Sequence, residues 1–322
     1  MRRRAREAPV SDLAATTVER LLALKMVAPF SGLPPDDLAL LIERAKPRVL
    51  DAGDVLVSEG VPLDAIHLLL SGSLTEERNG QPWAVRTPYE LVGGVDALAR
   101  SGERLVVRAT EPTETLELDR ATLLDVCLDR FGILATVASG IAATAIAARR
   151  HLGPHAGYDR APDAAHAPLE PAGTLDVAAI VAHLRAVAPL SGTPIHTLVY
   201  AAGEGTAVTI EPGTGLWRAG DPADHVVLAL SGRIDCVTTD ETQRFTLGAG
   251  EAVGLLDALA LVPRWYGATA ATRVVGLRFS MATLLDILED DPETAVAALV
   301  HLAQATAGLV DAVASPAPSG PV

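Results

Sequence analysis

The chain of 322 residues contains two copies of one sequence pattern, and this repeat limits the folds that it can adopt. The stretch GGVDALARSGERLVVRAT at 93–110 matches GLLDALALVPRWYGATAA at 254–271 without a gap, at an offset of 161 residues. Residues 28–72 match residues 188–232 at an offset of 160, again without a gap and with most glycines and prolines aligned. We therefore predict an internal duplication in which both halves form the same domain.

The order of elements within each copy predicts a mainly β domain. Short apolar runs with a period of two alternate with glycine-rich turns over 46–118 and 205–279, and this pattern is typical of strands. Many short strands of this kind favour a small sandwich or a jelly-roll barrel. A long helical stretch follows each set of strands, at 120–152 and 281–313.

Composition along the chain predicts five segments. Residues 1–11 form a basic tail that we expect to be disordered, and 12–152 form the first domain. Residues 153–173 are rich in proline and alanine and lack periodicity, which predicts a linker. The second domain covers 174–314, and a short disordered tail follows at 315–322.

The charge of the chain argues against a nucleic acid partner. The formal net charge is −14, whereas binding to phosphates needs clustered Lys and Arg. Neither closing helix is followed by a pattern typical of a helix-turn-helix. We therefore expect a protein that does not bind DNA or RNA.

The sequence contains no recognisable catalytic or metal-binding pattern. The eight histidines lack the paired spacing of a metal-binding jelly roll, and we interpret His67, in an apolar strand, as a core residue. Neither a nucleophile elbow nor a GxxxxGK[ST] loop is found. We expect no enzyme activity, no metal and no cofactor.

Three features favour the cytoplasm. Cys127 and Cys236 are far apart in the sequence, and we interpret both as buried thiols in a reducing compartment. The N-terminus lacks the apolar run of a signal peptide. The uncharged run 131–148 has the minimum length of a membrane helix, but it consists mostly of small residues, so we expect no membrane span.

Each copy contains one long segment followed by a glycine-led stretch. The two segments are PFSGLPPDDLALLIERAKPRVLDAGDVLVSEGVPLDAIHLLLSG and PLSGTPIHTLVYAAGEGTAVTIEPGTGLWRAGDPADHVVLALSG. On these residues, each copy resembles a cyclic nucleotide-binding domain, of the kind found in catabolite activator proteins and in regulatory subunits of protein kinase A. It implies an α+β chain, mainly β, with two eight-stranded jelly-roll domains. Short N-terminal helices and a long closing C-terminal helix would flank each domain.

The binding cassette of this family begins with glycine, has a glutamate next that accepts the ribose 2′-hydroxyl, and has an arginine ten residues after the glycine that holds the cyclic phosphate. In the first copy these positions carry Gly93, Gly94 and Glu103. Arg104 is one residue away from the arginine position, which in a strand places its side chain on the opposite face. A carboxylate in place of the guanidinium repels phosphate, so we expect no cyclic nucleotide in the first copy.

The second copy carries Gly254, Leu255 and Arg264 at the same three positions. Arg264 could therefore hold a phosphate, whereas Leu255 cannot accept a bond from a ribose hydroxyl. Both copies place an aspartate, Asp96 or Asp257, in the first turn after the glycine, where an anion competes with phosphate for the helix N-terminus. Of the aromatic residues that follow Arg264, we expect alternation to bury one and packing to be its role.

Two function classes remain open. One is a regulatory sensor whose second domain weakly binds cyclic AMP, cyclic GMP or another phosphate-containing ligand. The other is a protein-interaction module that has kept the fold and lost the ligand. Either class implies an unidentified protein partner. The apolar run within 120–152 further predicts a homodimer through this helix, with burial against the second domain as the alternative.

Overall fold

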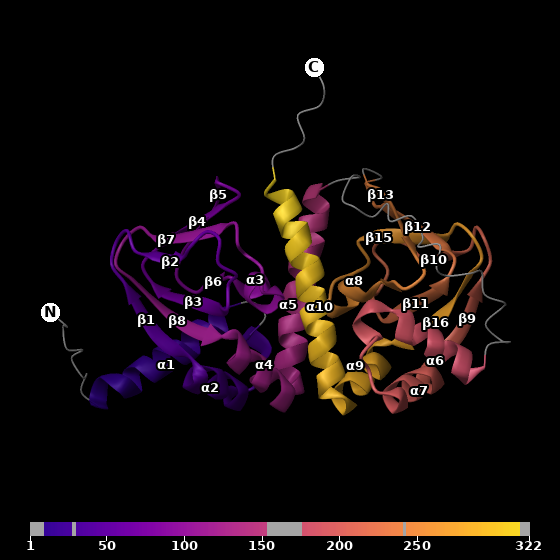
Figure 1. Cartoon of the computed structure of the whole chain (residues 1–322), viewed down its shortest axis with the longest axis horizontal. Coiled ribbons are helices and arrows are strands. Elements are labelled where there is room, and N and C mark those ends of the chain that lie inside the picture. The colour runs from indigo at the N-terminus through magenta and orange to yellow at the C-terminus, as the bar shows by residue number, and fades with distance from the viewer. Residues whose placement is uncertain (1–9, 28–29, 153–175, 241–242, 316–322) are drawn as a thin grey trace, which may run out of the picture. The chain divides into compact units, whose positions relative to one another are not determined.

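A computed structural model describes residues 10–27, 30–152, 176–240 and 243–315 (Figure 1). The chain divides into two compact units, residues 1–137 and 138–322. The predicted linker at 153–173 lies outside the described residues, as do most of the two predicted tails.

The first unit begins with helices, continues into eight strands and ends in helices, the last of which continues beyond residue 137 into the second unit. Two prolines and two acidic residues start the second helix, because proline suits the first helical position and acidic side chains stabilise a helix N-terminus. The elements are α1 (Val10–Met26), η1 (Phe30–Gly32), α2 (Pro35–Arg44), β1 (Lys46–Leu50), β2 (Val55–Val57), β3 (Ala65–Ser71), β4 (Leu74–Arg78), β5 (Gln81–Arg86), β6 (Leu91–Val92), α3 (Gly94–Ala99), β7 (Leu105–Ala109), β8 (Thr113–Asp119), α4 (Arg120–Asp129) and α5 (Phe131–Leu152).

The second unit repeats this order element by element. Its elements are α6 (Val177–Ala186), η4 (Ala188–Leu190), α7 (Ile195–Glu204), β9 (Thr206–Ile210), β10 (Gly215–Trp217), β11 (His225–Ser231), β12 (Arg233–Thr238), β13 (Arg244–Gly248), β14 (Ala252–Val253), α8 (Leu255–Leu259), β15 (Tyr266–Ala270), β16 (Val274–Ser280), α9 (Met281–Asp290) and α10 (Pro292–Val313).

Each unit contains two four-stranded antiparallel sheets with the same strand order. In the first unit the orders are β1-β8-β3-β6 and β2-β7-β4-β5. In the second unit they are β9-β16-β11-β14 and β10-β15-β12-β13, which is the same connectivity shifted by eight strands. Two sheets connected in this way form a jelly roll. The predicted duplication and the predicted jelly-roll fold are therefore confirmed.

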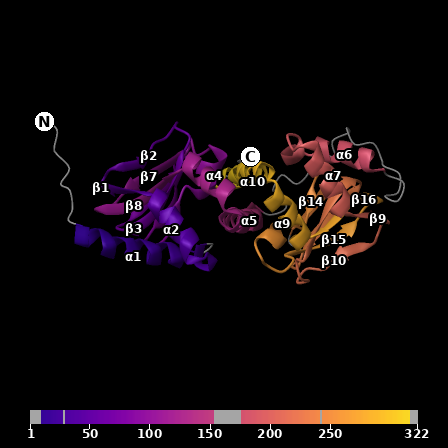
Figure 2. The ribbon, with the colours of Figure 1, turned by 90° about the horizontal axis from the view of Figure 1, so that it is seen from below.

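Helices cover one face of a sheet in each unit, and the other face lies inside the jelly roll. In the second unit Leu228 and Leu277 pack on α6, α7 and α9, whereas Val227 and Val274, on the opposite face, belong to the core between the sheets. In the first unit α1 and α2 lie along β3 and β8 in the same manner (Figures 1 and 2). The cassette helices α3 and α8 follow β6 and β14 at the sheet edges.

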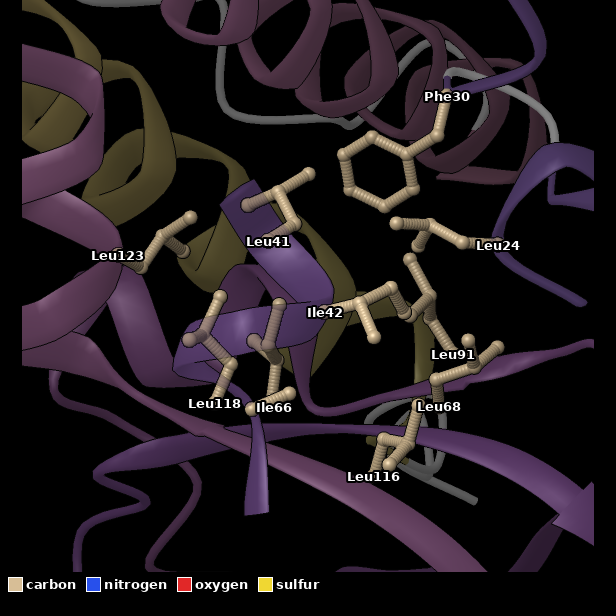
Figure 3. Close-up of a pocket in the computed structure, with 11 residues that line it drawn as sticks. Leu24, Phe30, Leu41, Ile42, Ile66, Leu68, Leu91, Leu116, Leu118 and Leu123 are labelled. Atoms are coloured by element: carbon tan, nitrogen blue, oxygen red, sulfur yellow. The ribbon is translucent and has the colours of Figure 1, made fainter. Parts of the chain in front are cut away.

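A small void remains under the helices of the first unit. Its volume is about 30 Å³, and only apolar side chains from α1, α2, α4 and three strands line it, among them Phe30, Ile42 and Leu116 (Figure 3). A void of this volume is comparable to one water molecule, and a water needs polar partners that these side chains do not offer. It is a packing defect of the core and not a ligand site.

The predicted long closing helix is present in each domain, as α5 and α10 of 22 residues each, but it begins later than the predicted helical stretches at 120–152 and 281–313, because each stretch is broken near its start. In the first domain Arg130 leaves helical geometry between α4 and α5, with φ −137° and ψ 90°. In the second, Asp291 does the same between α9 and α10. Its carboxylate accepts the Thr294 N–H at 3.0 Å and caps α10, and Pro292 occupies the first position of the new helix.

Within the described part of the chain, two helices, α5 and α10, are long and apolar enough to span a membrane, with mean hydropathies of 1.9 and 1.5 over their most apolar 18 residues. The C-terminal half of α5 packs within the second unit, where Ile146 belongs to the core cluster and the Arg150 carbonyl accepts Gln243 Nε2 at 2.9 Å. Such packing is typical of a core helix in a globular domain.

Candidate functional site

The two cassettes have the same backbone geometry. Gly93 and Gly254 adopt φ of 76° and 83°, and each directly precedes a short helix. Positive φ is strained for residues with a Cβ atom, so glycine is required at both positions. Gly94 and Leu255 are the first residues of α3 and α8.

Backbone hydrogen bonds show that Glu103 and Arg264 occupy equivalent positions. The Gly60 N–H donates to the Glu103 carbonyl at 2.7 Å, and the matching Gly220 N–H donates to the Arg264 carbonyl at 2.8 Å. Their side chains differ in environment, because Glu103 is exposed whereas the Arg264 side chain is completely buried. The predicted alignment of the two cassettes is therefore correct at this position.

The Arg264 guanidinium is held by groups of its own domain. Its Nη1 donates to the Gly254 carbonyl at 2.8 Å, and its Nη2 donates to the His225 carbonyl. Its Cζ lies 4.0 Å from the ring centre of Trp217, a cation–π contact. A Cβ atom at Gly254 would overlap Nη1. The guanidinium therefore occupies the space directly against the cassette glycine.

Asp257 provides the charge that accompanies Arg264. Its side chain is completely buried, and Oδ2 lies 3.5 Å from Arg264 Nη1. Burial raises the pKa of Asp257 to about 6, and the charges of Arg264 and Arg149 reduce the rise. Burial likewise lowers the pKa of Arg149 to about 10. Asp257 Oδ1 has no hydrogen-bond partner among the described residues.

Aromatic side chains close the same region. Tyr266 Oη accepts the Gly254 N–H at 3.1 Å, so this backbone donor is not available to a phosphate. Trp265 contacts Tyr266 edge to face at 5.2 Å between ring centres, and it stacks on Phe245 at 5.5 Å. Trp265 and Tyr266 are both buried, whereas alternation predicted only one. Both pack in the core of the domain, as does Trp217.

The first cassette is closed by a different arginine. Arg78, at the end of β4, makes two hydrogen bonds to Asp96, with Nη1–Oδ1 at 3.1 Å and Nη2–Oδ2 at 2.5 Å. Ser101 Oγ adds a third at 3.2 Å to Oδ1. Both charged side chains are at least nine-tenths buried. A Cβ atom at Gly93 would overlap the side chain of Leu63.

Arg104 does not replace the missing cassette arginine. Its side chain is exposed, and Nη1 donates to Asn79 Oδ1 at 3.2 Å. Among the described residues, Asn79 and not Asp96 accepts a hydrogen bond from its guanidinium. The expectation that a one-residue shift places this guanidinium on the other face of the strand agrees with the structure.

The two domains therefore share the aspartate and differ in the arginine. Asp96 and Asp257 lie at equivalent positions of α3 and α8. The strand registers pair Arg78 with Leu105 and Thr238 with Tyr266, so the second domain has threonine where the first has Arg78. Sequence reasoning identified both aspartates and Arg264 but missed Arg78, because the repeat shows no arginine at its matched position.

Residues 207–291 match the sequence model of the cyclic nucleotide-binding domain. Among solved structures, the chain is similar to the regulatory subunit of a cAMP-independent protein kinase A from Trypanosoma brucei, with 18% identity over 89% of this chain and 91% of the other, and a TM-score of 0.34. The Toxoplasma gondii protein kinase A regulatory domain, solved with cAMP, gives 15% identity, 89% and 98% coverage, and a TM-score of 0.33.

The catabolite activator protein of Thermus thermophilus gives 24% identity over 36% of this chain and 56% of the other, with a TM-score of 0.34. No curated protein matches the chain. In the described ranges, no three His, Cys, Asp or Glu side chains lie close enough together to hold a metal ion.

Proposed function

We propose that this chain, which contains a cyclic nucleotide-binding domain at 207–291 and a first domain of the same strand order, is a non-catalytic regulatory module that acts without a cyclic nucleotide in either cassette. The observation that carries the proposal is the position of the Arg264 guanidinium, which lies against Gly254 and is bound to two carbonyls of its own domain. In this proposal, regulation operates through contacts with a partner protein in the cytoplasm.

The free-energy cost of moving Arg264 supports cassettes that do not bind a cyclic nucleotide. To receive a phosphate, Arg264 would have to give up its hydrogen bonds to the Gly254 and His225 carbonyls. The Gly254 carbonyl would keep only a long bond from the Ala258 N–H, at 3.4 Å. Each buried polar group left without a partner costs about 1–3 kcal/mol, and about 1.4 kcal/mol corresponds to a tenfold change in affinity. Leu255 adds to this cost, because it offers no acceptor for a ribose hydroxyl. We therefore expect any cyclic nucleotide to bind weakly.

The first prediction is that the full-length protein does not bind cyclic AMP or cyclic GMP at micromolar concentrations. Isothermal titration calorimetry measures this directly. Leu255→Glu restores the family's acceptor for the ribose and leaves the Arg264 contacts in place, so it should not create binding. Micromolar binding to the wild type that Arg264→Ala abolishes would contradict the proposal.

A sensor remains the second candidate function, and one observation favours it. Arg264 occupies the family's arginine position within the residues that match the family model. Because the pKa of Asp257 is raised to about 6, protonation weakens its attraction for Arg264 in mildly acidic solution. Binding of cyclic AMP at pH 5.5 but not at pH 7.5 would favour this candidate.

A further inference from the structure

The second domain contains a pocket that includes no residue of its cassette. The pocket has a volume of about 390 Å³ and lies among β9, β10, β11 and β16. Its apolar walls are residues that also contact the core of the domain, namely Val208, Ile210, Leu216 and Val227. Arg278 and His225 line it as well. A volume of several hundred Å³ with apolar walls and a few polar groups is typical of small-molecule sites.

Arg278 is the cationic group of this pocket. It lies on β16 directly opposite Val227 on β11, so both side chains are on the same face of the sheet. The residue is exposed, and its guanidinium has no hydrogen-bond or ion-pair partner among the described residues. The carboxylate that lines the pocket, Glu211, is bound to Arg273 at 3.2 Å.

In the first domain, the residue equivalent to Arg278 has a charged partner within the domain. There His67 on β3 lies opposite Glu117 on β8, the pair equivalent to Val227 and Arg278. Arg48 Nη1 donates to Glu117 Oε2 at 2.8 Å. The equivalent of Arg48 is Val208, as the pairings Arg48–Thr115 and Val208–Gly276 show.

The second domain thus has a positive charge, Arg278, where the first has the negative charge of Glu117, and it has no charged residue in place of Arg48. A carboxylate held by an arginine in the first domain becomes a lone arginine, and the side chains of Arg48 and His67 become valines. These replacements leave open volume next to an uncompensated cation. The carboxylate of a bound ligand would pair with Arg278 as Glu117 pairs with Arg48 in the first domain.

We propose that this pocket binds a small aliphatic monocarboxylate, with the carboxylate on Arg278 and the chain on Val208, Ile210, Leu216 and Val227. The guanidinium fork matches a carboxylate in geometry. A single cation neutralises one negative charge, and the carboxylate of Glu211, which lines the pocket, disfavours a dianion such as phosphate. This site goes beyond the proposed function and does not depend on the state of the cassettes.

Titration of the full-length protein with hexanoate tests the proposal, with neutral hexanamide as the matched probe. A ligand of this size binds with a Kd on the order of 1 mM or tighter. Hexanoate should bind, hexanamide should bind at least tenfold more weakly, and the affinity for hexanoate should fall as the salt concentration rises.

Variants distinguish the pocket from adventitious binding. Arg278→Gln should weaken hexanoate at least tenfold, whereas Arg233→Gln, an exposed arginine on β12 that does not line the pocket, should leave the affinity unchanged. Val208→Phe fills the pocket without touching the charge and should also abolish binding, with the fold checked by circular dichroism. The proposal fails if hexanoate does not bind, if hexanamide binds equally, or if Arg278→Gln binds like the wild type. None of these outcomes bears on the cyclic nucleotide titration.

Discussion

At the scale of single residues, each cassette contains a buried aspartate that is paired with an arginine. The arginine comes from a different position in the two domains. Asp96 receives Arg78 from β4, and Asp257 receives Arg264 from the cassette itself. A buried carboxylate is costly unless it is paired and hydrogen-bonded. The aspartate therefore accounts for the presence of one arginine in each domain, although the arginine differs in sequence position.

The pair Arg78–Asp96 should behave as a unit when it is altered. Arg78→Ala leaves Asp96 buried without its charge partner, which typically costs about 3–5 kcal/mol in the free energy of unfolding. The double variant Arg78→Leu/Asp96→Leu should cost clearly less than the single variant, since no buried charge remains. Chemical unfolding followed by the fluorescence of Trp83, the one tryptophan before residue 217, measures both. Equal costs would contradict a coupled pair.

Asp257 should make the second domain less stable as the pH rises from about 4 to 6. Its pKa of about 6 in the folded state lies above the ordinary value of 3.8 for an aspartate, so between these pH values the folded state binds more protons than the unfolded state. Stability is therefore greater below this range, and the loss is at most about 3 kcal/mol. Asp257→Asn should remove this pH dependence, whereas Asp235→Asn, at an exposed site, should keep it. Unfolding curves at pH 4.5 and 7.5 provide the comparison.

At the scale of elements, the strands were predictable and the helix breaks were not. Short apolar runs within the predicted region 46–118, such as VLV at 55–57, form strands, because short β-branched runs between glycine-rich turns favour extended backbone. The break at Asp291 was encoded by an acidic cap and Pro292, but the repeat suggested a continuous helix. At Arg130 the sequence offers no proline or glycine before Phe131, and we have no sequence-based account of that break.

The cap of α10 should contribute measurably to stability. Asp291 accepts the Thr294 N–H at 3.0 Å and Thr197 Oγ1 at 2.6 Å. Burial raises the pKa of Asp291, but these hydrogen bonds outweigh it, and the pKa lies below its usual value. Asp291→Ala should cost about 0.5–2 kcal/mol, near the upper value because a second bond is lost. Asp286→Ala, within α9, is the control in a thermal unfolding experiment and should have a smaller effect.

At the scale of the whole molecule, the repeat predicted the architecture and the position of the cassettes, because both follow from backbone requirements such as positive φ at Gly93 and Gly254. It did not predict what fills the cassettes. The contact of Arg264 with the His225 carbonyl joins residues 39 positions apart, and the donor in the first domain lies at an unmatched position. Side-chain occupation of this kind depends on tertiary packing, which a repeat alignment does not contain.

The proposed homodimer also belongs to this scale. Ala143 lies on an exposed position of α5 and is small enough for close approach of a second helix. We expect a dimer at tens of micromolar by multi-angle light scattering, and Ala143→Glu should convert it to a monomer. Ala147→Ser, at another exposed alanine of α5, is a conservative control. If the wild type is a monomer, the dimer prediction is wrong, and the apolar face of α5 serves to pack residues such as Ile146 in the second unit.

The packing of α5 has a consequence for how the chain can be divided. The repeat places the boundary between the domains in the segment 153–173, yet Ile146 and the Arg150 carbonyl belong to the core and to a hydrogen bond of the second unit. A fragment that begins at residue 174 would lack both and would present an uncovered apolar surface to water. A protease or a cloning boundary that respects the folded unit therefore has to fall before residue 138, inside the continuous helix.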